Sequence, residues 1–350
     1  SGRIAEIENR KSKIENSRPR LLSALQDLNV ASKEWVIRQY DHEVQGRSVI
    51  KPLVGPMFGP SDAAVLRPLY TSQKGIALGC GLCPHWSDID PYWMAARAVD
   101  EAFRNVICVG ADPERVAILD NFCWPKADTE ESLGALVRTC KGASDVALAY
   151  GLPFISGKDS LNNQFSMSEA EARRTGLPRQ LTIPPTLLIS AIGIVENVGR
   201  CVTMDLKSPG HVLVLATGNP GFEFSISAAL AVHRSVAELI QKGQVFAAHD
   251  VSDGGLAVTL AEMCIASDFG ATIELNNAAV PFDLFDEPAA TYVLEISAKE
   301  ATDSGLPVIG TVTAEPVLRI RSSADEKIEV AVCDLDAAWR SPLTRGESRS

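Results

Sequence analysis

The sequence lacks any long apolar run. Among its 350 residues, 46% are hydrophobic, but no stretch approaches the roughly 18 to 20 residues that cross a bilayer. The longest candidate, residues 186–195, is short enough to be a buried strand. The first twenty residues are charged and have no apolar core, so no secretory signal is predicted. We therefore expect a cytoplasmic protein that has no membrane partner.

Basic residues are also in deficit. Lysine and arginine number 33 against 44 acidic residues, which gives a formal net charge of -11. A broad basic surface is not expected, and this excludes duplex nucleic acid as a first choice of partner. A local basic pocket for a phosphate is compatible with this balance.

The 8 cysteines and 5 histidines do not form a metal-binding pattern. Only Cys80 and Cys83 are closely spaced, and a zinc ribbon needs a second pair roughly 15 to 20 residues away. The other cysteines lie mostly in apolar runs, where we expect small, reduced, hydrophobic side chains. No Gly-x-Ser-x-Gly elbow is present, so the sequence assigns no catalytic residue.

Patterns typical of strands and helices alternate along the chain, which predicts an α/β (α+β) fold. At roughly 150 residues per domain, the length predicts two domains. Residues 169–179 are polar and charged, as in an exposed insertion. Helices are expected over residues 17–28, 91–109, 130–150, 225–242 and 256–266.

Three acidic strings carry the oxygen ligands that Mg²⁺ prefers. Asp62 follows a Gly-Pro-Ser turn, and Asp250 lies between a predicted strand and a glycine turn that could cradle an anion. Glu101 and Asn105 are four residues apart, so a helix places them on one face. Taken singly, each string is also typical of an ordinary turn or a solvated helix face.

Lys158 follows another predicted strand and stands between a glycine and an aspartate. A lysine in this setting can bind a phosphate as a point charge. The spacing is not that of a Walker A loop, and the alternative is a polar loop.

Together these strings resemble the phosphoribosylformylglycinamidine synthase family, specifically the second half of its synthetase region. That family belongs to the aminoimidazole ribonucleotide synthetase-like superfamily. The stretches that carry the resemblance run in the family's order, and no single one of them is as specific as the ordered set. They are residues 40–46, 61–65, 98–105, 156–163, 183–186 and 249–256.

The resemblance implies a two-domain unit and a set of roles. A linker segment (1–50) would precede a sheet-pairing N-terminal α/β domain (51–198) that carries metal and nucleotide. A C-terminal α/β domain (199–338) and a loose tail (339–350) would follow. The implied magnesium ligands are Asp62, Glu101, Asn105 and Asp250. The implied nucleotide contacts are Lys33 and Ser252, and Lys158 joins them on electrostatic grounds.

The implied activity is that of an ATP-dependent C–N ligase of purine biosynthesis. Such an enzyme converts formylglycinamide ribonucleotide and glutamine-derived ammonia to formylglycinamidine ribonucleotide, with Mg²⁺ and ATP or ADP as cofactors. The expected partners are a preceding homologous half and a glutaminase domain or subunit. Without them we expect an incomplete enzyme that forms a homodimer. The nucleotide site could be catalytic or auxiliary.

Two alternatives stay open. One is a non-catalytic module that binds a nucleotide as structure, and the other is a stand-alone homodimeric kinase or synthetase of the same superfamily. Two departures from the family matter here. The family's catalytic histidine belongs to the first half, which nothing here matches. The region 216–248 is short, and residues 218–221 (Gly-Asn-Pro-Gly) replace a serine-containing glycine loop, so no nucleotide contact is expected from it.

Overall fold

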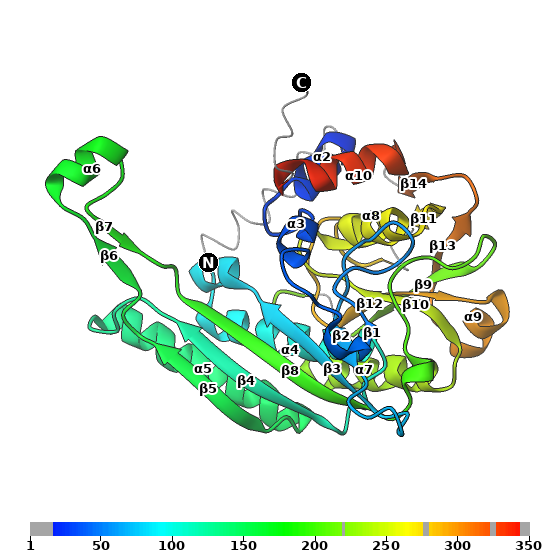
Figure 1. The fold of residues 1–350 in the computed structure, drawn as a ribbon, viewed down its shortest axis with the longest axis horizontal. Helices are drawn as coiled ribbons and strands as arrows, with labels where there is room; N and C mark the ends of the chain where they lie inside the picture. Colours follow the sequence, from blue (N-terminus) through cyan, green and yellow to red (C-terminus); the bar gives the residue numbers. More distant parts are fainter. Residues whose placement is uncertain (1–16, 219–220, 276–279, 323–326, 344–350) are drawn as a thin grey trace. The chain divides into compact units, whose positions relative to one another are not determined.

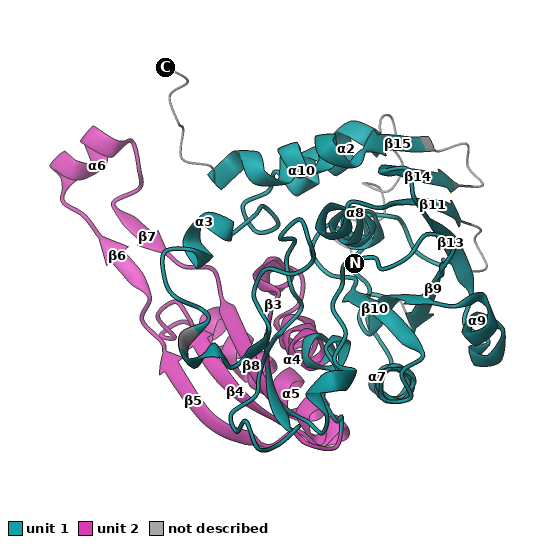
Figure 2. Ribbon diagram, turned by 45° about the vertical axis from the view of Figure 1, so that its right-hand side comes forward, with its two compact units in different colours: residues 1–77, 104–113, 193–350 teal, residues 78–103, 114–192 magenta. Residues whose placement is uncertain are grey.

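The computed structural model describes residues 17–218, 221–275, 280–322 and 327–343. The start of the predicted linker, the centre of the 218–221 loop and most of the predicted tail lie outside the described residues. The chain divides into two compact units (Figure 2). The first unit comprises residues 1–77, 104–113 and 193–350, and the second comprises 78–103 and 114–192.

A seven-stranded sheet is the framework of the first unit, with the strand order β10-β12-β9-β13-β11-β14-β15. Strand β12, the second in this order, is buried along its whole length and pairs antiparallel with both β10 and β9. The strands are β9 (Val212–Thr217), β10 (Val245–Asp250), β11 (Gly270–Leu275), β12 (Thr291–Ile296), β13 (Val308–Thr313), β14 (Val317–Ser322) and β15 (Lys327–Ala331).

Helix α8 (Gly255–Ser267) is buried on nearly every side, because it packs against the sheet and beneath α2 (Ser17–Leu25) and α10 (Val332–Arg340). A helix that is apolar all round is typical of such a position. Helix α7 (Ile226–Gln241) covers the other face of the sheet (Figure 1). These contacts fix the start of α8 against the end of β10.

Shorter elements complete the first unit. Strands β1 (Ser48–Ile50) and β2 (Ala64–Leu66) pair antiparallel. The others are helices α3 (Glu34–Ile37) and α9 (Ala298–Ser304) and the 3₁₀ turns Val44–Gly46, Val198–Arg200 and Ser341–Leu343.

The second unit is built on four strands in the order β3-β8-β4-β5, two of which, β4 and β5, run parallel. They are β3 (Gly75–Leu82), β4 (Val116–Cys123), β5 (Phe154–Ser160) and β8 (Thr186–Val195). Helices α4 (Pro91–Cys108) and α5 (Glu130–Tyr150) accompany them, with a 3₁₀ turn at Pro84–Asp88. The hydroxyl of Tyr150 donates to Asp100 at 2.7 Å and ties α5 to α4.

The predicted exposed insertion is a short arm. Strands β6 (Gln164–Ser166) and β7 (Gln180–Thr182) pair antiparallel, and helix α6 (Glu169–Thr175) joins them. The side chain of Ser168 caps α6, and no residue of this helix is buried. The exposure expected for residues 169–179 is therefore confirmed.

The α/β architecture expected from the sequence is confirmed. The short elements β2, β6, β7, β15 and α9 were not expected, because each is too short to show a clear period, and helix α10 was missed although its buried residues have helical spacing. The domain limits implied by the resemblance stay a prediction. Among the described residues, no helix is long and apolar enough to cross a membrane.

Candidate magnesium and nucleotide site

A buried cluster of ionisable side chains lies in the first unit, at the carboxyl end of β10. We call Asp62, His249 and Glu262 the His249 cluster. The Nδ1 atom of His249 lies 2.9 Å from Asp62 Oδ1, and its Nε2 atom lies 3.0 Å from Glu262 Oε2. The side chains of Asp62 and His249 are only 2% and 7% exposed. An imidazole is therefore held between two carboxyl groups that are remote in sequence.

The turn between β10 and α8 brings the members of this cluster together. Gly254 and Gly255 have φ of 83° and 71°, a left-handed conformation that favours glycine. A Cβ on Gly255 would lie 2.6 Å from the carbonyl oxygen of Asp286 and 2.7 Å from that of Leu284. This close approach starts α8 directly after β10, and the helix then presents Glu262 to His249.

The glycine turn does not form the open anion cradle that its sequence suggested. The amide of Gly255 donates to the carbonyl of Ser252 at 2.9 Å, and the amide of Ala257 donates to that of Leu284 at 2.9 Å. The amide of Gly254 faces Glu287 Oε1 at 3.4 Å. These three donors are satisfied within the chain, so the expectation of a phosphate cradle at these amides was wrong.

Asp250 is held by a second buried cation. Its Oδ2 atom accepts from Arg104 Nε at 2.9 Å, and the two side chains are 5% and 4% exposed. Ser252 Oγ donates to Asp250 Oδ1 at 3.3 Å. The amide of Asp250 donates to Asp62 Oδ1 at 3.0 Å. The two aspartates are thus joined directly, and each has its own cationic neighbour.

The neighbouring charges shift the pKa values of the cluster in a consistent way. Burial opposes the charged imidazolium, yet Asp62 and Glu262 outweigh it and hold the pKa of His249 well above its ordinary value. Burial opposes the carboxylate at Asp62 too, but His249 lowers its pKa. At Glu262 burial prevails and the pKa is raised. Burial and the charges of Asp62 and Asp250 raise the pKa of Cys108, which is a neutral thiol.

Lys33 lies close enough to this cluster to interact with it electrostatically. Burial lowers its pKa, while Glu262, Asp27 and Asp253 act in the opposite direction. Its Nζ atom donates to the carbonyl oxygens of Ala31 at 2.5 Å and Asn29 at 3.3 Å. In the first unit, hydrogen bonds thus join Asp62, Asp250 and Ser252, whereas Lys33 reaches the cluster only through the charge of Glu262.

The other residues suggested by the sequence have partners of their own. Glu101 lies in the second unit, where its Oε2 atom accepts from the amide of Leu82 at 2.9 Å and from Cys83 Sγ at 3.2 Å. Asn105 follows on α4 one turn later. Lys158 lies on β5, and its Nζ atom donates to Ser160 Oγ.

The donor set can be tested against Mg²⁺. Ligand atoms of Asp62, His249 and Asp250 all lie within 4.8 Å of one another. Mg²⁺ takes one or two carboxylates and fills its octahedron with water and phosphate oxygens. A carboxylate offers about four lone-pair sites, and Asp62 has three donors: His249, the amide of Asp250 and the Cys108 thiol. Acceptor capacity therefore remains, and the two aspartates fit such an ion.

Sequence reasoning missed the cations that hold these aspartates. The histidines showed no ligand spacing, and the role of His249 depends on Asp62, 187 residues away. Arg104 pairs with Asp250 across 146 residues. The sequence signal for these two cations was that His249 directly precedes Asp250 and that Arg104 directly precedes Asn105.

The fold and this site define an α/β protein with a buried, cation-compatible pair of carboxylates at the end of a strand. Two family models match the chain. The first, AIR synthase related protein, N-terminal domain, matches residues 60–195. The second, AIR synthase related protein, C-terminal domain, matches residues 211–300. The chain belongs to the AIR synthase related protein family.

Curated relatives and solved structures agree with this assignment. The chain is similar to "Phosphoribosylformylglycinamidine synthase subunit PurL" of Parasynechococcus marenigrum (strain WH8102), with 32% identity over 94% of this chain and 47% of the relative. It thus spans about half the length of the curated relatives it matches. T. maritima PurL complexed with FGAR has a TM-score of 0.66 and 18% identity over 95% of this chain and 55% of that one. T. maritima PurL complexed with ADP has a TM-score of 0.66 and 20% identity over 97% and 55%. These two likenesses show the fold.

Proposed function

We propose that the chain is part of a phosphoribosylformylglycinamidine synthase and supplies a magnesium–nucleotide site. The parent enzyme would use ATP to convert formylglycinamide ribonucleotide and glutamine-derived ammonia to formylglycinamidine ribonucleotide. The name of the curated relative supports this proposal, as do the FGAR and ADP bound to the two T. maritima proteins.

The single observation that carries the proposal is the meeting of Asp62 and Asp250. They are 188 residues apart, yet the amide of Asp250 donates to the carboxylate of Asp62. Their carboxylate oxygens lie within 4.8 Å of each other, and buried carboxylates at that distance repel each other unless cations neutralise them. A site that holds them together is therefore suited to a cation.

Each residue has a proposed role. Asp62 and Asp250 would hold Mg²⁺, with Glu101 and Asn105 as further ligands on the basis of their helical spacing. When bound, the ion neutralises charge on nucleotide phosphates. Arg104 and His249 orient the two aspartates through the contacts described above. The proposed nucleotide contacts are Lys33, Ser252 and Lys158.

A thermal-shift titration with Mg²⁺ and ADP tests this site. Ligand at 100 times its dissociation constant should stabilise the chain by about 2.7 kcal/mol. Asp62→Asn should remove most of this gain, whereas Asp128→Asn, at an exposed side chain paired with Lys126, should leave it intact. Circular dichroism checks that each variant folds, and Ser252→Ala provides a milder second variant. No magnesium-dependent gain in the unmutated chain contradicts the proposal.

The partners are proposed as well. On β3, the side chains of Leu78, Cys80 and Leu82 alternate with buried residues and are exposed. An exposed apolar sheet face is typical of an interface. We propose that the preceding homologous half covers it in the complete enzyme, alongside a glutaminase domain or subunit. In the isolated chain a second copy would cover it, giving a homodimer.

Light scattering measures the mass of the isolated chain, and Leu78→Lys with Leu82→Lys should shift a dimer to a monomer. An ammonia-dependent ATPase assay with formylglycinamide ribonucleotide should show no turnover by the chain alone. A stable monomer of the unmutated chain would refute the packing argument. In the reconstituted enzyme, full turnover by Asp62→Asn despite lost nucleotide binding would identify the site as a structural module.

A further inference from the structure

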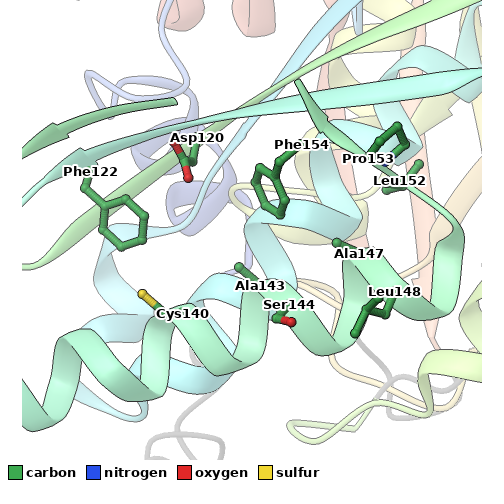
Figure 3. A pocket seen from close by; sticks show the side chains of 10 residues that line it. All are labelled: Asp120, Phe122, Cys140, Ala143, Ser144, Ala147, Leu148, Leu152, Pro153 and Phe154. Atoms are coloured by element: carbon green, nitrogen blue, oxygen red, sulfur yellow. The ribbon is translucent and has the colours of Figure 1, made fainter. Parts of the chain in front are cut away.

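The second unit contains a cavity of about 340 Å³ between its sheet and helix α5. Figure 3 shows Asp120, Phe122 and Phe154 pointing from β4 and β5 toward the helix, whose Ala147 and Leu148 lie opposite. Pockets of this size and mostly apolar lining, with a few polar groups, are typical of small-molecule sites. All of its lining residues belong to the second unit, so it is separate from the His249 cluster.

A carboxyl group is the unusual feature of this cavity. The Oδ1 atom of Asp120 is buried and has no side-chain hydrogen-bond partner, although the backbone of Lys158 and of Asp120 itself stabilises the ionised carboxyl group. Asp120 pairs in register with Gly157 on β5, and a Cβ at Gly157 would lie 2.1 Å from that oxygen. Gly157 therefore has to lack a side chain for the Asp120 carboxyl group to fit between the sheet and helix α5. Because Oδ1 is enclosed, a ligand in the cavity would reach this carboxyl group through its other oxygen, where a charge-assisted hydrogen bond can form.

The surroundings of Asp120 favour a positively charged donor. Burial raises the pKa of Asp120, and the negative charge of Asp159 raises it further. No basic residue is among those that line the cavity. The rest of the lining is apolar or small, apart from Ser144 and Cys140. A ligand that fits this lining is flat and apolar and carries a cationic N–H group.

We propose that this cavity binds a small aromatic cation with amidine or amine N–H donors. Its nitrogen would lie at the carboxyl group of Asp120. Its ring would lie between Phe122, Phe154 and the α5 side chain of Ala147. None of the residues that line this cavity is a proposed magnesium ligand or nucleotide contact, and its charge preference is opposite to that of a phosphate site.

Titration with benzamidine, followed by calorimetry or NMR on the 350-residue chain, tests the proposal. We expect saturable binding at one site. Benzoate has the same ring with the opposite charge and should bind at least about tenfold more weakly, because a charge-assisted hydrogen bond is lost.

Two variants locate the site. Asp120→Asn keeps the shape of the side chain and removes its charge, so it should weaken the binding of benzamidine by at least about tenfold. Ser144→Phe adds a ring at the exposed rim of the cavity on α5 and should block entry without disturbing the core. Asp128→Asn, at an exposed carboxylate on the same unit, is the matched control and should bind as the unmutated chain does.

Several results would overturn the proposal. They are no saturation at millimolar benzamidine, equal binding of benzoate, or unchanged binding in both Asp120→Asn and Ser144→Phe. Displacement of benzamidine by Mg²⁺ and ADP would place it in the nucleotide site instead. A failure of the nucleotide titration leaves these readouts unaffected, since none of them requires nucleotide.

Discussion

Replacing Arg104 by methionine should destabilise the first unit strongly. Methionine keeps much of the side-chain volume but removes the guanidinium that lies 2.9 Å from Asp250 Oδ2. It also removes the longer contact from Nη2 to the carbonyl of Val251 at 3.4 Å. The carboxylate of Asp250 would then remain buried with only the more distant His249, at 3.8 Å, as a cationic neighbour.

The size of the expected loss of stability follows from the burial of Arg104 and Asp250. Both side chains are at most 5% exposed, and removing one partner of a buried ion pair costs about 3 to 5 kcal/mol. A pair on the surface contributes about 1 kcal/mol or less. Arg173, which is 79% exposed and pairs with Glu169 on α6, offers the matched control.

Urea unfolding measures both variants. Arg104→Met should lower the free energy of unfolding by about 3 to 5 kcal/mol, and Arg173→Met by no more than about 1 kcal/mol. Adding Asp250→Asn to Arg104→Met should recover part of the loss, because no charge is left buried. Equal effects of the two arginine variants, or no recovery in the double variant, would refute the reasoning.

Three further predictions concern other features. Cys80→Ser and Cys83→Ser should both keep the magnesium–nucleotide stabilisation, and stoichiometric zinc in the purified protein would contradict this. Because the pKa of His249 is raised on folding, its stabilising charge is fully present below the unfolded pKa of about 6.5 and is lost as the pH rises through the folded value. The urea midpoint should therefore fall with rising pH, and His249→Gln should flatten that slope; an unchanged slope argues against a charged imidazolium. Gly255→Ala should lower the stability of the fold clearly more than Gly305→Ala. Gly305 has φ of 68° but nothing near its Cβ position, so only backbone strain of about 1 to 2 kcal/mol applies there. Equal melting temperatures of the two variants would disprove the crowding argument.

Local signals account for the parts of the fold that the sequence predicted well. Helix α5 begins and ends where expected, because Thr129 accepts from the amide of Ser132 and Gly151 adopts the left-handed conformation that ends a helix. Both signals depend on residues within one turn of the helix. Likewise, Asp62 and Asp250 could each be found from their own turns.

The arrangement around those aspartates depends on long-range packing instead. The contact between Glu262 and His249 requires α8 to start immediately after β10, which the crowding at Gly255 enforces. Nothing in the sequence around Gly255 says which carbonyl groups will approach it. The anion cradle was wrong for the same reason, since the carbonyl of Leu284 that engages Ala257 comes from a distant loop.

The net charge of the buried site shows why this long-range packing matters for function. The sequence has an excess of acidic residues, but composition cannot say which of them share a buried site. In the first unit, the carboxyls of Asp62, Asp250 and Glu262 are joined with the cations Arg104 and His249. With all three carboxyls ionised, the excess is one negative charge; burial raises the pKa of Glu262, and the charges of Asp250 and Asp62 add to this effect. A bound divalent cation would turn this excess into one net positive charge, so metal binding should lower the pKa of Glu262 toward its ordinary value.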